Sequence, residues 1–137
     1  MNNHLVDIVI PTYKRTDPLK VALESVVAQT YSNWQCWVVE DGQSKETEAC
    51  MRPFCQDKRF IYYPGEHFGF PAAPRNRAIL AGSGEYIAML DDDDCWLPEK
   101  LQYQVDFMSK HPECAMVGVN GYIWSGQEIK REDELLL

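Results

Sequence analysis

The segment from Val6 to Val27 reads VDIVIPTYKRTDPLKVALESVV and contains one complete strand–loop–helix unit. Its first five residues, VDIVI, form a β-branched run that Pro11 ends, which is typical of a short buried strand. Asp17 and Pro18 favour a helix start, with the aspartate as N-cap and the proline at the first helical position. The unit therefore predicts a strand followed by a helix with one apolar stripe. That stripe consists of Leu19, Ala22, Leu23, Val26 and Val27.

The same alternation continues along the chain. Further strands are predicted over 35–39, 59–63, 86–90 and 114–119. Further helices are predicted over 44–51, over 74–81 and from Leu97 onward. Strands that alternate with helices imply crossover connections, so the expected fold is α/β, with a mostly parallel sheet and helices on both of its faces.

Composition restricts the classes of function that remain. The 137 residues are enough for one domain with a real core, so residues 1–137 are expected to form a single domain. The net charge of −8 argues against nucleic acid as a partner, because a phosphate backbone requires a basic face. Five cysteines without metal-binding spacing, and a start without a signal peptide, favour reduced thiols. The expected location is the cytoplasm, with attachment to a membrane surface left open.

Polar residues gather where the predicted strands end. PTYKR (11–15) follows the first strand, Glu40 and Asp41 follow the second, and DDDD (91–94) follows the fourth. Ligands of open α/β sheets bind outside the carboxyl ends of the strands, so this convergence predicts a binding site there. PTYKR contains no glycine, whereas a dinucleotide-binding loop needs several, which disfavours a Rossmann dehydrogenase.

The four aspartates are the clearest candidate for a metal site. Alternate residues of an extended chain face the same side, so Asp91 and Asp93 are expected to point together and Asp92 elsewhere. Carboxylate oxygens suit hard cations such as Mg²⁺ or Mn²⁺. Asp94 is assigned to the start of the following helix, through the helix macrodipole.

Other residues are open to plainer explanations. Taken alone, Asp41 fits an Asp–Gly turn, and Pro11 with Thr12 fits either a strand end or a site. His67 lies in the Gly/Pro-rich segment GEHFGFPAAP, which leads into the helix of Arg75, so contact with a donor or acceptor is one interpretation, but a surface-loop histidine is the expectation. Trp96 fits core packing and a pocket wall equally well.

Two long segments resemble the nucleotide-binding half of a family 2 glycosyltransferase with the GT-A fold. They are VDIVIPTYKRTDPLKVALESVVAQTYSNWQCWVVEDGQS (6–44) and APRNRAILAGSGEYIAMLDDDDCWLPEKL (73–101), and the similarity extends from Val6 to about Trp124. The resemblance implies a nucleoside pocket lined by Pro11, Thr12 and Tyr13, with the tyrosine against the base. It also implies that Asp41 reads the pyrimidine ring, and Arg15 is counted among the donor-binding residues.

The diphosphate and sugar end of the site follows from the same resemblance. Arg75 and Asn76 match the helix start beside the nucleotide and its diphosphate. Asp91, Asp92 and Asp93 match the acidic DxD motif. Asp93 is the predicted metal ligand, and Asp91 or Asp92 is predicted to face the ribose or the donor sugar.

The implied reaction is transfer of a sugar from a nucleoside-diphosphate sugar, with UDP-sugars as the expected donors. The transfer would invert the anomeric carbon and depend on a divalent metal, Mn²⁺ or Mg²⁺. The acceptor would be a saccharide or a lipid-linked compound. No residue of this chain matches the catalytic base, which the resemblance places in a second, acceptor-binding half beyond the predicted fifth strand.

Two other hypotheses about the function stay open. One is a non-catalytic stub that binds nucleoside diphosphate and metal without an acceptor half. The other is a nucleotidyltransferase, which would be expected to carry a glycine-rich phosphate loop that PTYKR does not supply. A sheet edge left uncovered by an absent half would favour self-association as a homo-oligomer.

Overall fold

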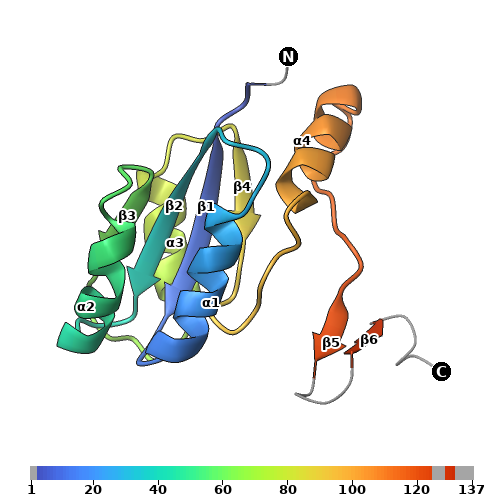
Figure 1. The fold of residues 1–137 in the computed structure, drawn as a ribbon. Coiled ribbons are helices and arrows are strands. Elements are labelled where there is room, and N and C mark those ends of the chain that lie inside the picture. Colours follow the sequence, from blue (N-terminus) through green and yellow to red (C-terminus); the bar gives the residue numbers. More distant parts are fainter. Residues whose placement is uncertain (1–2, 125–128, 132–137) are drawn as a thin grey trace.

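The computed structural model in Figure 1 describes residues 3–124 and 129–131. Its central sheet has four parallel strands in the order β3-β2-β1-β4. The strand bounds are Val6–Thr12 for β1, Trp34–Glu40 for β2, Phe60–Tyr63 for β3 and Tyr86–Met89 for β4. The parallel sheet predicted from the alternating pattern is confirmed.

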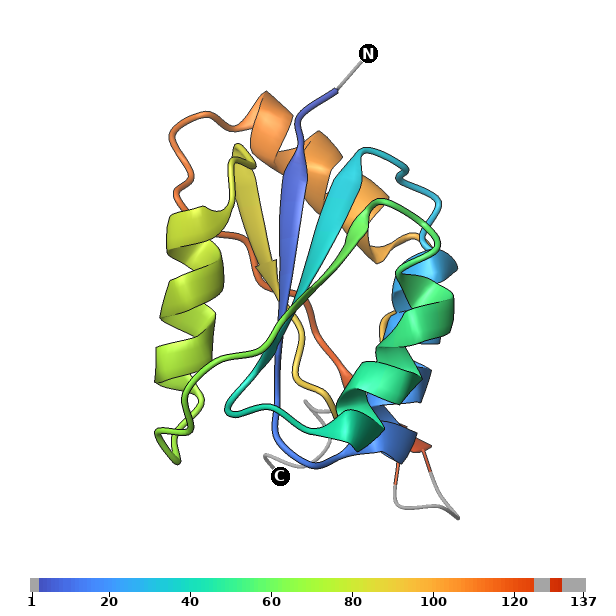
Figure 2. The same cartoon turned by 90° about the vertical axis from the view of Figure 1, so that its left-hand side faces the viewer.

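Helices cover both faces of this sheet, as predicted. Their bounds are Thr16–Val27 for α1, Lys45–Phe54 for α2, Ala72–Ala81 for α3 and Lys100–Lys110 for α4. Figure 2 shows α1 and α2 on one face and α3 on the other. The buried side chains of Leu101 and Val105 join the core on the α1 side, so α4 belongs to that layer. Within the described residues, no helix combines the length and the apolar character needed to cross a bilayer.

The central strand β1 supplies the core on both sides of the sheet. Ile8 and Ile10 point into the larger cluster, which α1, α2 and α4 cover. Val9 points the opposite way and packs with Val39 and Ala78 beneath α3. A strand buried on both faces needs apolar residues in succession, which is why VDIVI lacks the alternation of a half-exposed strand.

The exception in β1 is Asp7, a carboxylate that is only 3% exposed. It accepts hydrogen bonds from the side chains of Gln35 and Trp37 on β2, and from the backbone N–H of Gly84 at 2.6 Å. A buried carboxylate is tolerated when its oxygens are hydrogen-bonded. Asp7 therefore ties β1 both to β2 and to the turn between α3 and β4.

The helix starts differ from the sequence prediction in detail. α1 begins at Thr16, with Arg15 in the N-cap position and no side-chain capping bond, so Asp17 lies in the first turn instead of acting as the cap. A carboxylate there still faces the positive end of the helix dipole. Ser44 does cap α2, because its hydroxyl accepts the N–H of Thr47.

The predicted fifth strand over 114–119 is wrong. These residues form no strand, and Met116 is 86% exposed. An apolar run becomes a strand only where a hydrogen-bonding partner and a covering layer meet it, and this segment stays outside the sheet. A separate antiparallel pair follows instead, formed by β5 (Tyr122–Trp124) and β6 (Ile129–Arg131).

The edge at β4 is uncovered in the described chain. β4 pairs with β1 alone, and the side chains of Ile87 and Met89 are each 46% exposed. An exposed apolar edge strand is a surface on which another chain can pair. Self-association through this edge remains a prediction.

Replacing Gly84 with alanine should destabilise the fold. The new Cβ would lie 2.7 Å from the backbone nitrogen of Asp7 and 2.9 Å from the carbonyl oxygen of Tyr86, and neither can move without shifting its strand. Overpacking of this kind costs about 1–3 kcal/mol of unfolding free energy, measurable by urea denaturation. Gly118→Ala is the control, because nothing lies within 4 Å of its Cβ position. Equal stability of the two variants would contradict this account.

Candidate functional site

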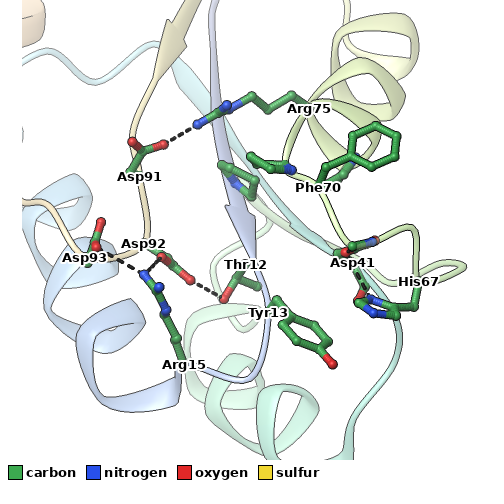
Figure 3. A pocket seen from close by; sticks show the side chains of 14 residues that line it. Thr12, Tyr13, Arg15, Asp41, His67, Phe70, Arg75, Asp91, Asp92 and Asp93 are labelled. Atoms are coloured by element: carbon green, nitrogen blue, oxygen red, sulfur yellow. Dashed lines mark hydrogen bonds and ion pairs between the residues drawn. The ribbon is translucent and has the colours of Figure 1, made fainter.

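The carboxyl ends of β1, β2 and β4, together with the segment that leads into α3, enclose a cavity of about 540 Å³ (Figure 3). This volume is in the range of small-molecule sites. The cavity brings together nine of the ten predicted donor and metal residues. They are Pro11, Thr12, Tyr13, Arg15, Asp41, Arg75, Asp91, Asp92 and Asp93. Asn76 is exposed on α3 and is not among the lining residues.

A buried hydrogen bond joins the ends of β1 and β4 at the base of the cavity. The hydroxyl of Thr12 donates to Oδ2 of Asp92 at 2.8 Å, and Nη1 of Arg15 lies 3.4 Å from Oδ1 of the same carboxylate. Thr12 is 4% exposed and Asp92 is 7% exposed. Asp92 is thus held by the loop after β1, and this contact fixes the acidic turn relative to that loop.

The remaining aspartates cluster because the chain turns after β4. The N–H of Asp94 donates to the carbonyl oxygen of Asp91 at 3.1 Å, and this turn brings the carboxylates of Asp91, Asp93 and Asp94 within 4.8 Å of one another. The pairing of Asp91 with Asp93 agrees with the prediction, although a turn and not an extended chain produces it. Partial burial, followed by repulsion from Asp93 and Asp91, raises the pKa of Asp94.

The assignment of Asp94 to the helix start is wrong. α4 begins at Lys100, with Glu99 in the N-cap position and no side-chain capping bond. The intervening residues separate Asp94 from that helix end, while the turn gives its carboxylate to the acidic cluster. Three carboxylates at this spacing offer the oxygen ligands that hard divalent cations take.

Two arginines face the acidic cluster from opposite sides of the cavity, as Figure 3 shows. Nη1 of Arg15 lies 3.1 Å from Oδ2 of Asp93, and Arg75 on α3 donates to Asp91. Together with Asp41 and Asp92, the lining carries four carboxylates and two guanidinium groups, a formal net charge of −2 with histidine neutral. The protein's own cations therefore balance only half of the negative charge.

Asp41 organises the loop on the nucleoside side of the cavity. Its two carboxylate oxygens accept the backbone N–H groups of Phe68 and Gly69, at 2.7 and 2.8 Å. Burial alone raises the pKa of this carboxyl, but the two N–H donors and the ring of His67 outweigh burial and lower it below its ordinary value. The side chain expected to read a pyrimidine ring thus also holds residues 67–69 in place.

His67 lies on an exposed loop, as predicted, and it also lines the cavity. The ring of His67 stacks on Tyr13, with centroids 4.6 Å apart and planes inclined by 15°, and its Nδ1 lies 3.0 Å from Oδ2 of Asp41. The sequence signal that could have placed it there is topological. GEHFG follows β3, which runs parallel to β1 and β2, so its carboxyl end lies on the same side of the sheet as theirs.

Two other residues are directed away from the cavity. Glu40 is 1% exposed and accepts hydrogen bonds from Ser44 and Tyr62, so it anchors the start of α2. Burial of Tyr62, followed by its hydrogen bond to Glu40, raises the pKa of that tyrosine. Trp96 packs against the core on the α1 side, with the ammonium of Lys100 4.0 Å from its ring centroid. Packing, and not a pocket wall, is therefore the role of Trp96.

Comparisons with known proteins agree with this arrangement. The model of Glycosyl transferase family 2 matches residues 7–136. The Escherichia coli UDP-Glc:alpha-D-GlcNAc-diphosphoundecaprenol beta-1,3-glucosyltransferase WfgD is 35% identical over 118 residues, which are 86% of this chain and 46% of that protein. The chain thus spans about half the length of this relative.

Solved structures show the same fold. S. aureus TarS 1-349 in complex with UDP-GlcNAc superposes with a TM-score of 0.72 at 23% identity, over 78% of this chain and 32% of that one. The mannosyltransferase PcManGT from Pyrobaculum calidifontis, in complex with GDP-Man and Mn2+, has a TM-score of 0.69 at 19% identity, over 76% and 32%. The predicted GT-A fold is therefore confirmed.

Asp41→Asn should make the fold less stable at neutral pH, and the loss should shrink in acid. Asparagine cannot accept both backbone N–H groups as a carboxylate does, so we expect a loss of about 2 kcal/mol at pH 7. Because the folded pKa is lowered, the stabilisation is complete above the ordinary value of about 3.9 and is lost as pH falls through the folded pKa.

Urea denaturation between pH 7 and pH 3 measures this difference, with Glu24→Gln, an exposed glutamate in the middle of α1, as the control. A gap between wild type and Asp41→Asn that stays constant over the whole range would exclude a stabilising carboxylate at this position.

Proposed function

The chain belongs to glycosyl transferase family 2, and from that membership we propose that the cavity at the carboxyl ends of the strands is the donor site of a sugar transferase. The observation that carries the proposal is the division of the cavity into two ends. Tyr13 and Asp41 form an aromatic and polar end, whereas Arg15 and Arg75 form a charged end with the acidic turn. A nucleoside diphosphate has the same division, with a planar base at one end and phosphates at the other.

The charge balance supports a donor that arrives with a cation. The lining has a formal net charge of −2, so a diphosphate alone would be repelled by the carboxylates that face it. A divalent cation between the carboxylates and the phosphates would turn that repulsion into attraction. Metal dependence is therefore part of the proposal, with Mn²⁺ or Mg²⁺ as the ion.

The acidic turn fits such a cation. Asp91, Asp93 and Asp94 offer three carboxylates with oxygens within 4.8 Å, and Asp93 is the proposed main ligand. When bound, the cation would stabilise the negative charge on the departing nucleoside diphosphate. The guanidinium groups of Arg15 and Arg75 supply further positive charge beside the phosphates, and Asp92 keeps the turn in position through Thr12.

The proposed donor is a UDP-sugar. WfgD is named for UDP-Glc, and the TarS complex holds UDP-GlcNAc. Guanine remains a second candidate, because the PcManGT complex holds GDP-Man. The planar face of Tyr13 accepts either base, and we propose that polar contacts near Asp41 select between them.

The acceptor side of the reaction lies outside the described cavity. We propose that residues 1–137 are the donor-binding part of the transferase, in agreement with their coverage of 46% of WfgD. We further propose a saccharide or lipid-linked acceptor, because WfgD is named for a diphosphoundecaprenol acceptor, and inversion at the anomeric carbon, as the family resemblance implies. The acceptor hydroxyl would then need a base on the face of the sugar opposite the diphosphate.

UDP together with Mn²⁺ should raise the thermal midpoint of the chain. At a ligand concentration 100 times Kd the gain is about 2.7 kcal/mol, a shift on the order of 10 °C for a domain of this size. Asp93→Ala should remove the Mn²⁺-dependent part of the shift, while Asp17→Asn on α1 should retain it. Differential scanning fluorimetry with UDP, GDP and each metal measures both, and no shift with any nucleoside diphosphate and metal would refute the donor-site assignment.

The chain alone should bind a UDP-sugar without transferring the sugar. Each aspartate that lines the cavity already accepts a donor from the protein: Asp41 from the loop, Asp91 from Arg75, Asp92 from Thr12 and Asp93 from Arg15. Asp41 and Asp92 are buried, and Asp91 and Asp93 are assigned to the cation, so none of these four is left to take the acceptor's proton. A UDP-release assay with UDP-glucose and a saccharide acceptor should therefore stay at background, and turnover would show that the base lies within this chain.

A further inference from the structure

The His67 side chain makes the contacts that the proposed site offers to a nucleobase. Its imidazole lies almost parallel to the Tyr13 ring, with centroids 4.6 Å apart and an interplanar angle of 15°. Nδ1 lies 3.0 Å from the Asp41 carboxylate and 3.1 Å from the carbonyl oxygen of the same residue. A flat heteroaromatic ring is thus stacked on the tyrosine and hydrogen-bonded to the aspartate, inside the cavity (Figure 3).

The covered face of Tyr13 has no room for a second ring. A base sandwiched between two rings needs a separation of roughly 6.8 Å, twice the stacking distance of 3.4 Å seen between bases in DNA. The observed centroid distance of 4.6 Å is well short of that. A nucleobase can therefore use this face of the tyrosine only after the imidazole has left it.

The side chain can leave without disturbing the loop. Two backbone hydrogen bonds, from Phe68 and Gly69 to Asp41, hold the main chain next to His67 and do not involve the imidazole. The His67 side chain is 51% exposed, so a rotation about its own bonds carries the ring into solvent. What is lost is one aromatic stack and the contacts of Nδ1 with Asp41.

We propose that His67 is an internal competitor for the nucleobase: the base stacks on the face of Tyr13 that the imidazole covers, so this ring must turn out before a nucleoside diphosphate binds. His67 then sets the affinity of the donor site, because only the fraction of molecules with the ring turned out is competent to bind. The inference rests on the proposed donor site and adds to it the residue that limits access to its base end.

The test compares UDP with inorganic pyrophosphate, both with Mn²⁺, by isothermal titration calorimetry on the wild type and on His67→Ala. An aromatic pair of this geometry corresponds to roughly a two- to tenfold equilibrium, so UDP should bind His67→Ala about two- to tenfold more tightly. Pyrophosphate has no base and should bind both proteins equally. His67→Phe keeps a ring over Tyr13 but loses the Nδ1 contacts with Asp41, so its UDP affinity should lie between those of the wild type and His67→Ala.

A matched control comes from the other end of the fold. His111 also stacks on an aromatic ring, that of Phe107 at 4.3 Å, and its Nδ1 lies 3.1 Å from Glu113, but it is not among the residues that line the cavity. His111→Ala should leave both affinities unchanged.

The outcomes separate this inference from the donor-site proposal. Unchanged or weaker UDP binding by His67→Ala, or an equal change for pyrophosphate, would overturn the competitor role and leave the donor site standing. If neither the wild type nor His67→Ala bound any nucleoside diphosphate, the donor-site proposal and the competitor role of His67 would both be overturned. Binding by His67→Ala alone would support both.

Discussion

Parallel pairing of β1 with both β2 and β4 is the constraint on which the rest of the structure depends. The register sets Thr12 opposite Glu40, and the backbone N–H of Leu90 donates to the carbonyl oxygen of Val9. The carboxyl ends of the three strands therefore lie side by side. Loops that are far apart in sequence meet there because parallel strands carry their carboxyl ends to the same side. The buried hydrogen bond between Thr12 and Asp92 then fixes two of these loops against each other.

The site at these strand ends is held together by contacts within the protein. Arg15 and Arg75 face the acidic turn, Asp41 binds the loop before α3, and the His67 ring covers Tyr13. In each of these contacts, a group of the protein takes the place that a diphosphate, a cation or a base would take in a bound donor. In our proposals a donor therefore exchanges internal partners for its own, and its affinity is the difference between the two sets.

Sequence reasoning reached the residues of the site more reliably than their contacts. It placed Tyr13, Asp41 and Asp93 correctly at strand ends, because the strand pattern alone locates those ends. It misassigned Asp94, and it placed His67 on a surface loop without its contacts to Tyr13 and Asp41, since a turn after β4 and a loop after β3 decide where these two side chains lie. Such turns depend on backbone hydrogen bonds that periodicity does not encode.

The amino-acid sequence by itself determined the α/β class, the order of strands and helices up to α4, and the family, because apolar periodicity and strand-end motifs are local properties of the chain. Only the tertiary structure decided the strand neighbours and the partners of each aspartate. It also decided that 114–119 stays outside the sheet, although the run is apolar enough for a strand. The reason is physical: a strand, an ion pair or a stacked ring exists only where a second segment comes within contact distance, and that depends on how the whole chain packs.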